Sequence, residues 1–250
     1  MSKIRVAREG AVRTVTLTRA EKRNALDHEM LAGLKAAFAE PAAAERVVVL
    51  RAEGTVFCAG LDLTERRGTL SEPSGIEEML HAIESFPLPV VAVVQGDAIA
   101  GGNELALHCD FVVAAATARF GMSLAQIGLA PTWFLAKKLL EVAGPVATRE
   151  ILLLGDPLPA ARLHELGIIG RCVPPAELQT AARAVIDRLA ANAPLSLKAM
   201  KALINREMAF RDAIPHADID RQIVAARDSV DAREGIAARL ERRKPSFVGR

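Results

Sequence analysis

The chain has 250 residues, of which 51% are hydrophobic, and this is enough to bury one sizeable core. Lys and Arg number 32 against 30 Asp and Glu, so a net charge of +2 excludes a general nucleic-acid or membrane-surface binder. The three widely spaced cysteines include no C-x-x-C pair, which argues against a disulfide framework or a structural zinc and favours a cytoplasmic location. Residues 1–10 are charged, and the uncharged run 86–96 is too short to span a bilayer, so no signal or anchor is expected.

The first third of the chain alternates short strands with helices. Two alternating runs, 4–8 and 11–18, predict a β-hairpin around Glu9-Gly10. Asp27 is a plausible N-cap for a helix, and 47–50 is a compact apolar strand that leads into a loop with Gly60 near its end. Residues 64–75 are polar and rich in turn formers, which is typical of a surface segment, and 76–86 is expected to be helical.

Residues 90–110 form the stretch around which we expect the chain to be organised. A run of β-branched residues passes through Gly96 and Asp97 to the pair Gly101-Gly102, and predicts a buried strand, a tight loop and a helix N-terminus. The unpaired N–H groups of a first helical turn can hold an oxyanion, and Glu104 follows within one or two turns. The alternative is that the glycines only permit close helix packing and that Glu104 faces solvent.

The second half begins with two strands and then becomes helical. Residues 111–115 and 119–121 read as strands, and 127–131 as a turn into a helix that holds Trp133. Further helices are expected at 145–154, 160–166, 176–191, 195–208, 218–229 and 231–242. The pattern changes near residue 190, so the sequence predicts an α/β core over 1–190 and a helical C-terminal region over 191–250.

Five motifs in order carry a family resemblance. They are FCAGLDLTE (57–65), VVAVVQGDAIAGGNELALHCD (90–110), FGMSLAQIGLAP (120–131), GDPLPAARLHELGIIGRCVP (155–174) and DAREGIAARLERRKPSFVGR (231–250). Together they resemble the crotonase superfamily, the enoyl-CoA hydratases and isomerases, over essentially the whole chain. The resemblance implies a core of ββα spiral turns, a helical C-terminal region that mediates trimerisation and covers CoA, and a homotrimer or dimer of trimers.

The resemblance also assigns site residues. The backbone N–H groups of Leu61 and Gly101 would form the oxyanion hole that binds the thioester carbonyl, and Glu104 would be the acid–base residue. Family hydratases use a second glutamate, and the matching position here is Leu124. One carboxylate performs hydration poorly, whereas moving a double bond needs only one base, so the residues favour isomerisation. The agreement with known isomerases is partial, because the mitochondrial ones keep their glutamate at the position of Leu124 and lack the one that matches Glu104.

The substrate implied by the resemblance is an acyl-CoA thioester, with no separate cofactor and no metal. CoA would lie along Arg23, Ala25 and the loop from Ala59 to Leu61, and Lys244 would reach its nucleotide. Further candidate cations are Arg66, Arg67, Arg242 and Arg243. The acyl pocket would involve Met79, Leu124, Trp133 and Phe134.

Two alternatives stay open. A chain without the second glutamate could be a catalytically weak or inactive acyl-CoA-binding protein. Another acid, Asp62, Glu65 or Asp97, could supply a second proton relay, although Asp62 is better explained as a brace for its own loop. His108 follows Glu104 by one helical turn, and a packed or surface histidine is the expected role.

Overall fold

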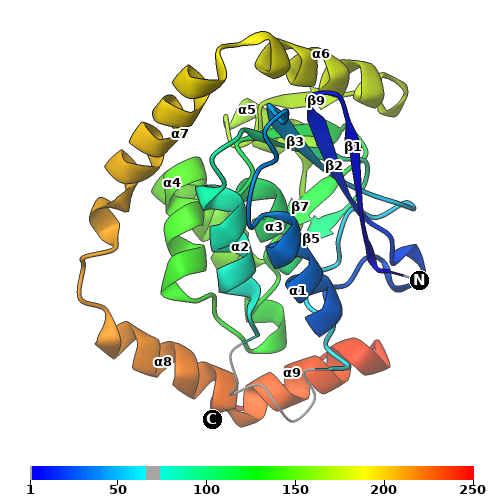
Figure 1. Cartoon of the computed structure of the whole chain (residues 1–250). Coiled ribbons are helices and arrows are strands. Elements are labelled where there is room, and N and C mark those ends of the chain that lie inside the picture. The colour runs from blue at the N-terminus through cyan, green and yellow to red at the C-terminus, as the bar shows by residue number, and fades with distance from the viewer. Residues whose placement is uncertain (1, 66–73) are drawn as a thin grey trace.

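A six-stranded sheet forms the centre of the computed structural model, which describes residues 2–65 and 74–250 (Figure 1). The strand order is β1-β2-β3-β4-β6-β9. Their bounds are β1 Ile4–Glu9, β2 Val12–Leu17, β3 Val47–Ala52, β4 Val90–Val94, β6 Phe111–Ala115 and β9 Arg171–Val173. β1 and β2 pair antiparallel with Ile4 opposite Leu17, which confirms the predicted hairpin, and the other pairs are parallel.

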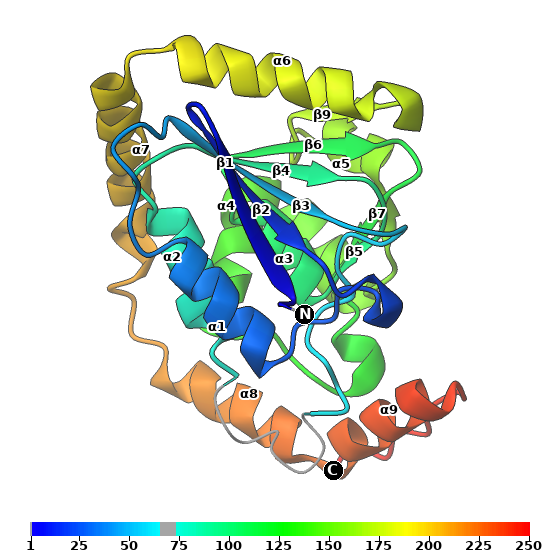
Figure 2. The same cartoon turned by 45° about the vertical axis from the view of Figure 1, so that its right-hand side comes forward.

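Helices cover both faces of this sheet. Helix α6 (Leu178–Ala191) packs Leu178, Ala182 and Ile186 against one face, where it meets alternate valines of β3 and β4. The opposite face is covered by α1 (His28–Ala37), α2 (Ile76–Ser85), α3 (Gly101–Leu107) and α4 (Trp133–Arg149), and most of the core lies there (Figure 2). Because β4 is buried along its whole length between these layers, its run of apolar residues shows no alternation.

The helix boundaries follow local signals in the sequence. The Asp27 side chain accepts a hydrogen bond from the Met30 N–H, which confirms the predicted N-cap of α1. Gly144 has a φ of 65° inside α4, so the helix is broken there and resumes at Pro145, the predicted start of the next helix. It continues into the π-helical turn η3 (Glu150–Leu154). The predicted surface segment 64–75 falls largely on residues 66–73, which lie outside the described residues.

Three short strands were missed by the sequence prediction. β5 (Ala98–Ile99) lies in a segment that was expected to be only a loop, and β8 (Leu158–Pro159) was not expected either. Both pair with β7 (Arg119–Gly121), which was predicted as a strand. β9 adds the sixth strand to the main sheet between the helices expected at 160–166 and 176–191. Strands of two or three residues are too short to show a period, and their pairing depends on distant partners.

After α5 (Ala160–Glu165) and α6, the chain runs around the outside of the core through α7 (Pro194–Met208), η5 (Ala209–Arg211), α8 (Ala217–Asp228) and α9 (Val230–Glu241) (Figure 1). Helix α9 returns to the core at the 3-10 turn η2 (Ala125–Ile127). A Cβ atom at Gly235 would lie 2.4 Å from the Ile127 carbonyl, so the two backbones touch. Within the described residues, every helix is too short or too polar to cross a bilayer.

Candidate active site

Three loops lie in parallel register beside the N-terminus of α3. Leu26 pairs with Leu61, and Cys58 pairs with Ala98. The Leu26 N–H donates to the Gly60 carbonyl over 2.7 Å, and the Asp62 N–H donates to the Leu26 carbonyl over 2.9 Å. Because successive N–H groups of an extended chain point in opposite directions, the N–H of Leu61 points away from Leu26. It has no hydrogen-bond partner in the described part of the chain.

Gly101 lies directly against this loop. A Cβ atom on Gly101 would lie 3.5 Å from the Leu61 nitrogen, and one on Gly60 would lie 3.1 Å from the Gly101 nitrogen. Gly60 has a φ of 90°, which favours glycine. Gly101 is the first residue of α3, so its N–H has no acceptor within the helix. The structure therefore brings together two unpaired main-chain donors, Leu61 and Gly101, from segments forty residues apart in sequence.

The Glu104 side chain lies in the first turn of α3, where every residue is buried. It is 0% exposed, and neither carboxylate oxygen has a hydrogen-bond partner among the described residues. Burial raises the pKa of Glu104 to about 8, although the neighbouring Asn103 amide and the Lys138 ammonium group oppose this change. The solvated alternative for Glu104 is therefore wrong. A buried carboxyl that titrates near neutral pH is suited to proton transfer.

His108 lies beside Glu104 as a packed histidine. Its Nδ1–H donates to the Glu104 main-chain carbonyl over 2.8 Å, and the same nitrogen lies 3.7 Å from Glu104 Oε2. Burial, followed by the charge of Lys138, lowers the pKa of His108 to about 4, so the ring is neutral at pH 7. The Phe134 ring is stacked on it, with 5.2 Å between centroids. Phe134 is thus separated from Glu104 by one imidazole.

A buried ionic cluster that was not predicted from the sequence lies between α2 and α4. Lys138, on α4, pairs with Glu84 of α2 and lies 3.1 Å from Glu141. Although burial alone would lower it, these two carboxylates hold the pKa of Lys138 above its usual value. The spacing of Lys138 and Glu141 within an apolar helix was the available signal. Their burial was not foreseeable, because it depends on how α2, α4 and α7 pack.

Leu124 and Trp133 take different positions around the site. Leu124 precedes η2, and its half-buried side chain packs on the core. Trp133 stacks on His216, with 4.6 Å between ring centroids, so it contacts the connection between η5 and α8. Met79 is fully buried in the core. Phe134, which was expected to line an acyl pocket, is connected to Glu104 through His108.

The residues expected to contact CoA lie in two regions. The Ala59 N–H donates to the Arg23 carbonyl over 3.1 Å, so Arg23, Ala25 and Ala59 lie along the loops that present Leu61. Lys244 lies in the exposed tail after α9. Arg66 and Arg67 lie outside the described residues.

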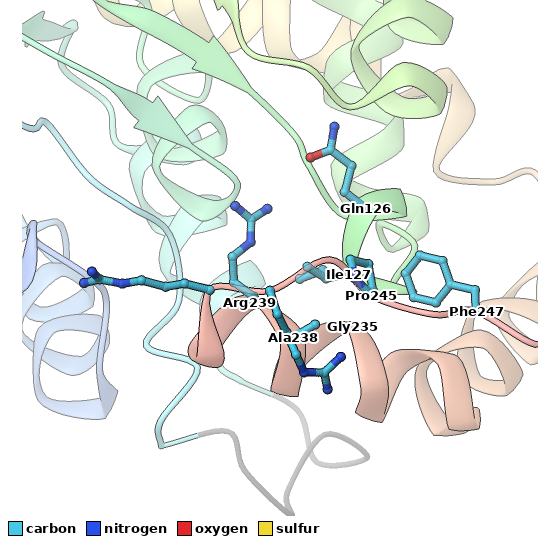
Figure 3. Close-up of a pocket in the computed structure, with 9 residues that line it drawn as sticks. Gln126, Ile127, Gly235, Ala238, Arg239, Pro245 and Phe247 are labelled. Atoms are coloured by element: carbon cyan, nitrogen blue, oxygen red, sulfur yellow. The ribbon is translucent and has the colours of Figure 1, made fainter.

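A cavity of about 590 Å³ lies where α9 and the tail meet η2 (Figure 3). Its lining includes Gln126, Phe247 and three arginines, Arg239, Arg242 and Arg243. Arg243 is paired with Glu234 over 2.7 Å and with Glu241 over 2.6 Å. In the described part of the chain, Arg239 and Arg242 form no ion pair. These two side chains are therefore available to an anionic ligand.

The other candidate acids, Asp62, Glu65 and Asp97, form hydrogen bonds within their own loops or with neighbouring segments. The Asp62 carboxylate accepts from the Thr64 N–H and hydroxyl group and from Arg19, which confirms its role as a brace. Although burial alone would raise it, these hydrogen bonds hold the pKa of Asp62 below its usual value. The Glu65 carboxylate accepts from the His28 N–H, and the Asp97 carbonyl accepts from Phe57 and Cys58.

The fold and the family motifs define an α/β protein of the crotonase superfamily, and comparison with known proteins agrees. The Enoyl-CoA hydratase/isomerase family pattern matches residues 7–250. The probable enoyl-CoA hydratase echA6 of Mycobacterium leprae is 31% identical over 98% of this chain and 99% of the relative. The 1,2-epoxyphenylacetyl-CoA isomerase of Escherichia coli is 33% identical over 97% of each.

Solved structures of acyl-CoA enzymes have the same fold as this chain. Methylmalonyl-CoA decarboxylase in complex with 2S-carboxypropyl-CoA has a TM-score of 0.92 at 26% identity, over 100% of this chain and 99% of that one. The chain therefore belongs to the enoyl-CoA hydratase/isomerase family, whose members process acyl-CoA thioesters.

Proposed function

We propose that this protein moves a double bond in an acyl-CoA thioester, with Glu104 as its single acid–base residue and the N–H groups of Leu61 and Gly101 as the oxyanion hole. The observation that carries the proposal is the meeting of these two unpaired donors beside a buried carboxyl whose pKa is about 8. Leu124, at the position of the second family glutamate, supplies no second carboxylate.

The proton transfer needs one carboxylate. Glu104 removes a proton from the carbon next to the thioester carbonyl of a 3-enoyl group, and the electron pair moves onto the carbonyl oxygen to form an enolate. The two N–H groups stabilise that oxygen, and losing one such donor costs about 3 kcal/mol of transition-state stabilisation. Glu104 then returns the proton to the γ-carbon, which leaves a 2-enoyl thioester. No water is consumed, so no second carboxylate is required to hold one.

The CoA moiety would lie along Arg23, Ala25 and Ala59. Its phosphates call for cations, and Arg239, Arg242 and Lys244 form no ion pair within the described residues. We propose that these C-terminal side chains hold the phosphates, either in their own subunit or across a trimer contact.

Acyl-CoA binding without turnover is the second candidate. The raised pKa of Glu104 favours this second candidate. A carboxyl with a pKa of about 8 is mostly protonated at pH 7 and cannot then act as a base. An oxyanion hole without a competent base still binds thioesters.

The deciding experiment follows proton exchange at the α-carbon by NMR in deuterated water, with a saturated acyl-CoA and a 3-enoyl-CoA as substrates and crotonyl-CoA hydration measured alongside. We expect deuterium uptake and double-bond migration without rapid hydration. The rate should rise with pH up to about 8 and then level off, because the carboxylate is the active form.

Glu104→Gln should abolish exchange while leaving the dissociation constant for CoA thioesters nearly unchanged, and Glu177→Gln on the surface should alter neither. Full activity in Glu104→Gln would show that another group is the base. Binding without exchange in the wild type would establish the binding-protein function instead.

A further inference from the structure

A second cavity, of about 310 Å³, lies between α2, α4 and the end of α7. In Figure 1, α7 runs down the side of the molecule on which α2 and α4 lie. Phe134 forms part of the cavity wall and stacks on His108, which lies 3.7 Å from Glu104. The cavity is therefore separated from the proposed base by two rings. To reach the cavity, an acyl group whose α-carbon faces Glu104 would have to run past both rings.

The cavity has a charged lining, which is unusual for an alkyl-binding site. Glu84, Glu141 and Asp212 supply three carboxylates, against the two ammonium groups of Lys137 and Lys138. Lys137 lies 2.6 Å from Asp212, and Lys138 is shared by the two glutamates. Both lysines are thus already paired, and one negative charge is left over.

One carboxylate oxygen of Glu141 accepts no hydrogen bond from the described residues. Its side chain is 5% exposed, and its Oε2 lies 3.1 Å from Lys138 Nζ. The other oxygen, Oε1, is buried and has no hydrogen-bond partner among the described residues. Leaving a buried acceptor without a donor is unfavourable, so it calls for a bound group that carries an N–H or O–H.

We propose that this cavity receives the far end of the acyl group and selects a terminus that donates a hydrogen bond, an ammonium or hydroxyl group, which Glu141 accepts. Ile204 and Met208 supply apolar wall for the methylene carbons before it. A carboxylate terminus is disfavoured, because both lysines are paired and the lining is negative overall. The inference rests on the proposed function, since it requires the thioester to lie at Glu104.

The test uses acyl-CoA thioesters that differ only at the terminus. Dissociation constants of 6-aminohexanoyl-CoA, 6-hydroxyhexanoyl-CoA and heptanoyl-CoA are measured by calorimetry with the whole protein, and the series is repeated with chains one carbon shorter and one longer. For the chain length that fits, we expect the ammonium compound to bind at least tenfold more tightly than the methyl compound, with the hydroxyl compound between them.

Glu141→Gln presents an amide in place of the carboxylate and keeps the side-chain shape. It should remove the preference for the ammonium terminus and leave heptanoyl-CoA binding unchanged, whereas Glu165→Gln, at an exposed position of α5, should preserve the preference. Equal affinities for the three termini in the wild type at every chain length, or a preference that survives in Glu141→Gln, would overturn the inference and leave water as the partner of Oε1.

The two proposals fail in different ways. If α-proton exchange is absent but the terminal preference is present, the proposed reaction fails and the cavity assignment stands. If exchange occurs at equal rates and affinities for every terminus, the reaction stands and the cavity assignment fails.

Discussion

Glu104 determines both the chemistry and the pH dependence of the site. Its pKa is raised from 4.5 to about 8, chiefly by burial, so between these values the folded chain holds a proton that the unfolded chain has lost. The free energy of unfolding therefore falls as pH rises through this window, and the loss is complete above pH 8.

Replacing the carboxyl group with an uncharged one should remove this pH dependence. We expect Glu104→Gln to gain on the order of a few kcal/mol of stability relative to the wild type between about pH 5 and pH 9, because the amide never ionises. Urea unfolding of both proteins at the two pH values measures the difference. A difference between the proteins that does not change with pH would mean that the Glu104 pKa is not raised in the folded chain.

Leu124 is the residue that separates single-base chemistry from hydration in this proposal. Leu124→Glu should place a second carboxylate in the site and increase the rate of crotonyl-CoA hydration by about 10²-fold or more, which is the usual contribution of a positioned acid–base group. Leu124→Gln serves as the matched control, since it has the same size but no acid. An equal gain in both variants would attribute the effect to polarity rather than to proton transfer.

At the scale of elements, glycine contacts hold α3 against the loop of residues 57–61. A Cβ atom at Gly102 would lie 2.1 Å from the Cys58 carbonyl oxygen, so no side chain fits there. Gly60 and Gly101 are also neighbours, since a Cβ atom at Gly101 would lie 3.4 Å from the Gly60 Cα atom. This contact, rather than any side-chain hydrogen bond, fixes the distance between the two proposed oxyanion donors.

Gly102→Ala should therefore push α3 away from this loop. We expect it to lower the free energy of unfolding by about 1–3 kcal/mol, as overpacking does, and to abolish α-proton exchange because the donor pair separates. Chemical denaturation and the NMR exchange assay measure the two effects. Gly170→Ala is the control, because the nearest atom would be a carbonyl oxygen at an ordinary 3.5 Å. Normal exchange in Gly102→Ala would contradict the assigned role of this contact.

At the scale of the whole molecule, α7 and the turn after it expose a large apolar surface. Leu195, Met200, Leu203 and Phe210 are all more than half exposed. Apolar patches of this extent on a soluble domain usually mark an interface between chains. We therefore expect this surface to form subunit contacts in the homotrimer or dimer of trimers that the resemblance implies.

Sedimentation velocity should therefore give the mass of a trimer or hexamer. Leu203→Glu, at a side chain that is 60% exposed, should shift the protein to smaller species, because burying an unpaired carboxylate at an interface is costly. Ala184→Glu introduces the same charge on the exposed face of α6 and should leave trimers intact. A monomeric wild type would contradict the assignment.

Local patterns in the sequence determined much of the fold. The hairpin, the Asp27 cap, the helix start at Gly101 and the six C-terminal helix segments all follow from residue periodicity and from turn and capping residues that act within a few positions. The motifs also identified the family and named Glu104, Leu61 and Gly101 as candidates, because the spacing of motifs can be read from the sequence without knowledge of contacts.

Only the tertiary structure decided which of these residues meet. The pairing of Leu26 with Leu61 and of Cys58 with Ala98 places the Leu61 and Gly101 donors together, and these pairs are isolated bridges between loops, which leave no period in the sequence. Burial likewise turned Glu104 from an ordinary helix acid into a group with a pKa near 8, and it assembled Lys138, Glu84 and Glu141 into one cluster. Desolvation is a property of packing between distant segments, so no pattern within a short stretch of sequence contains it.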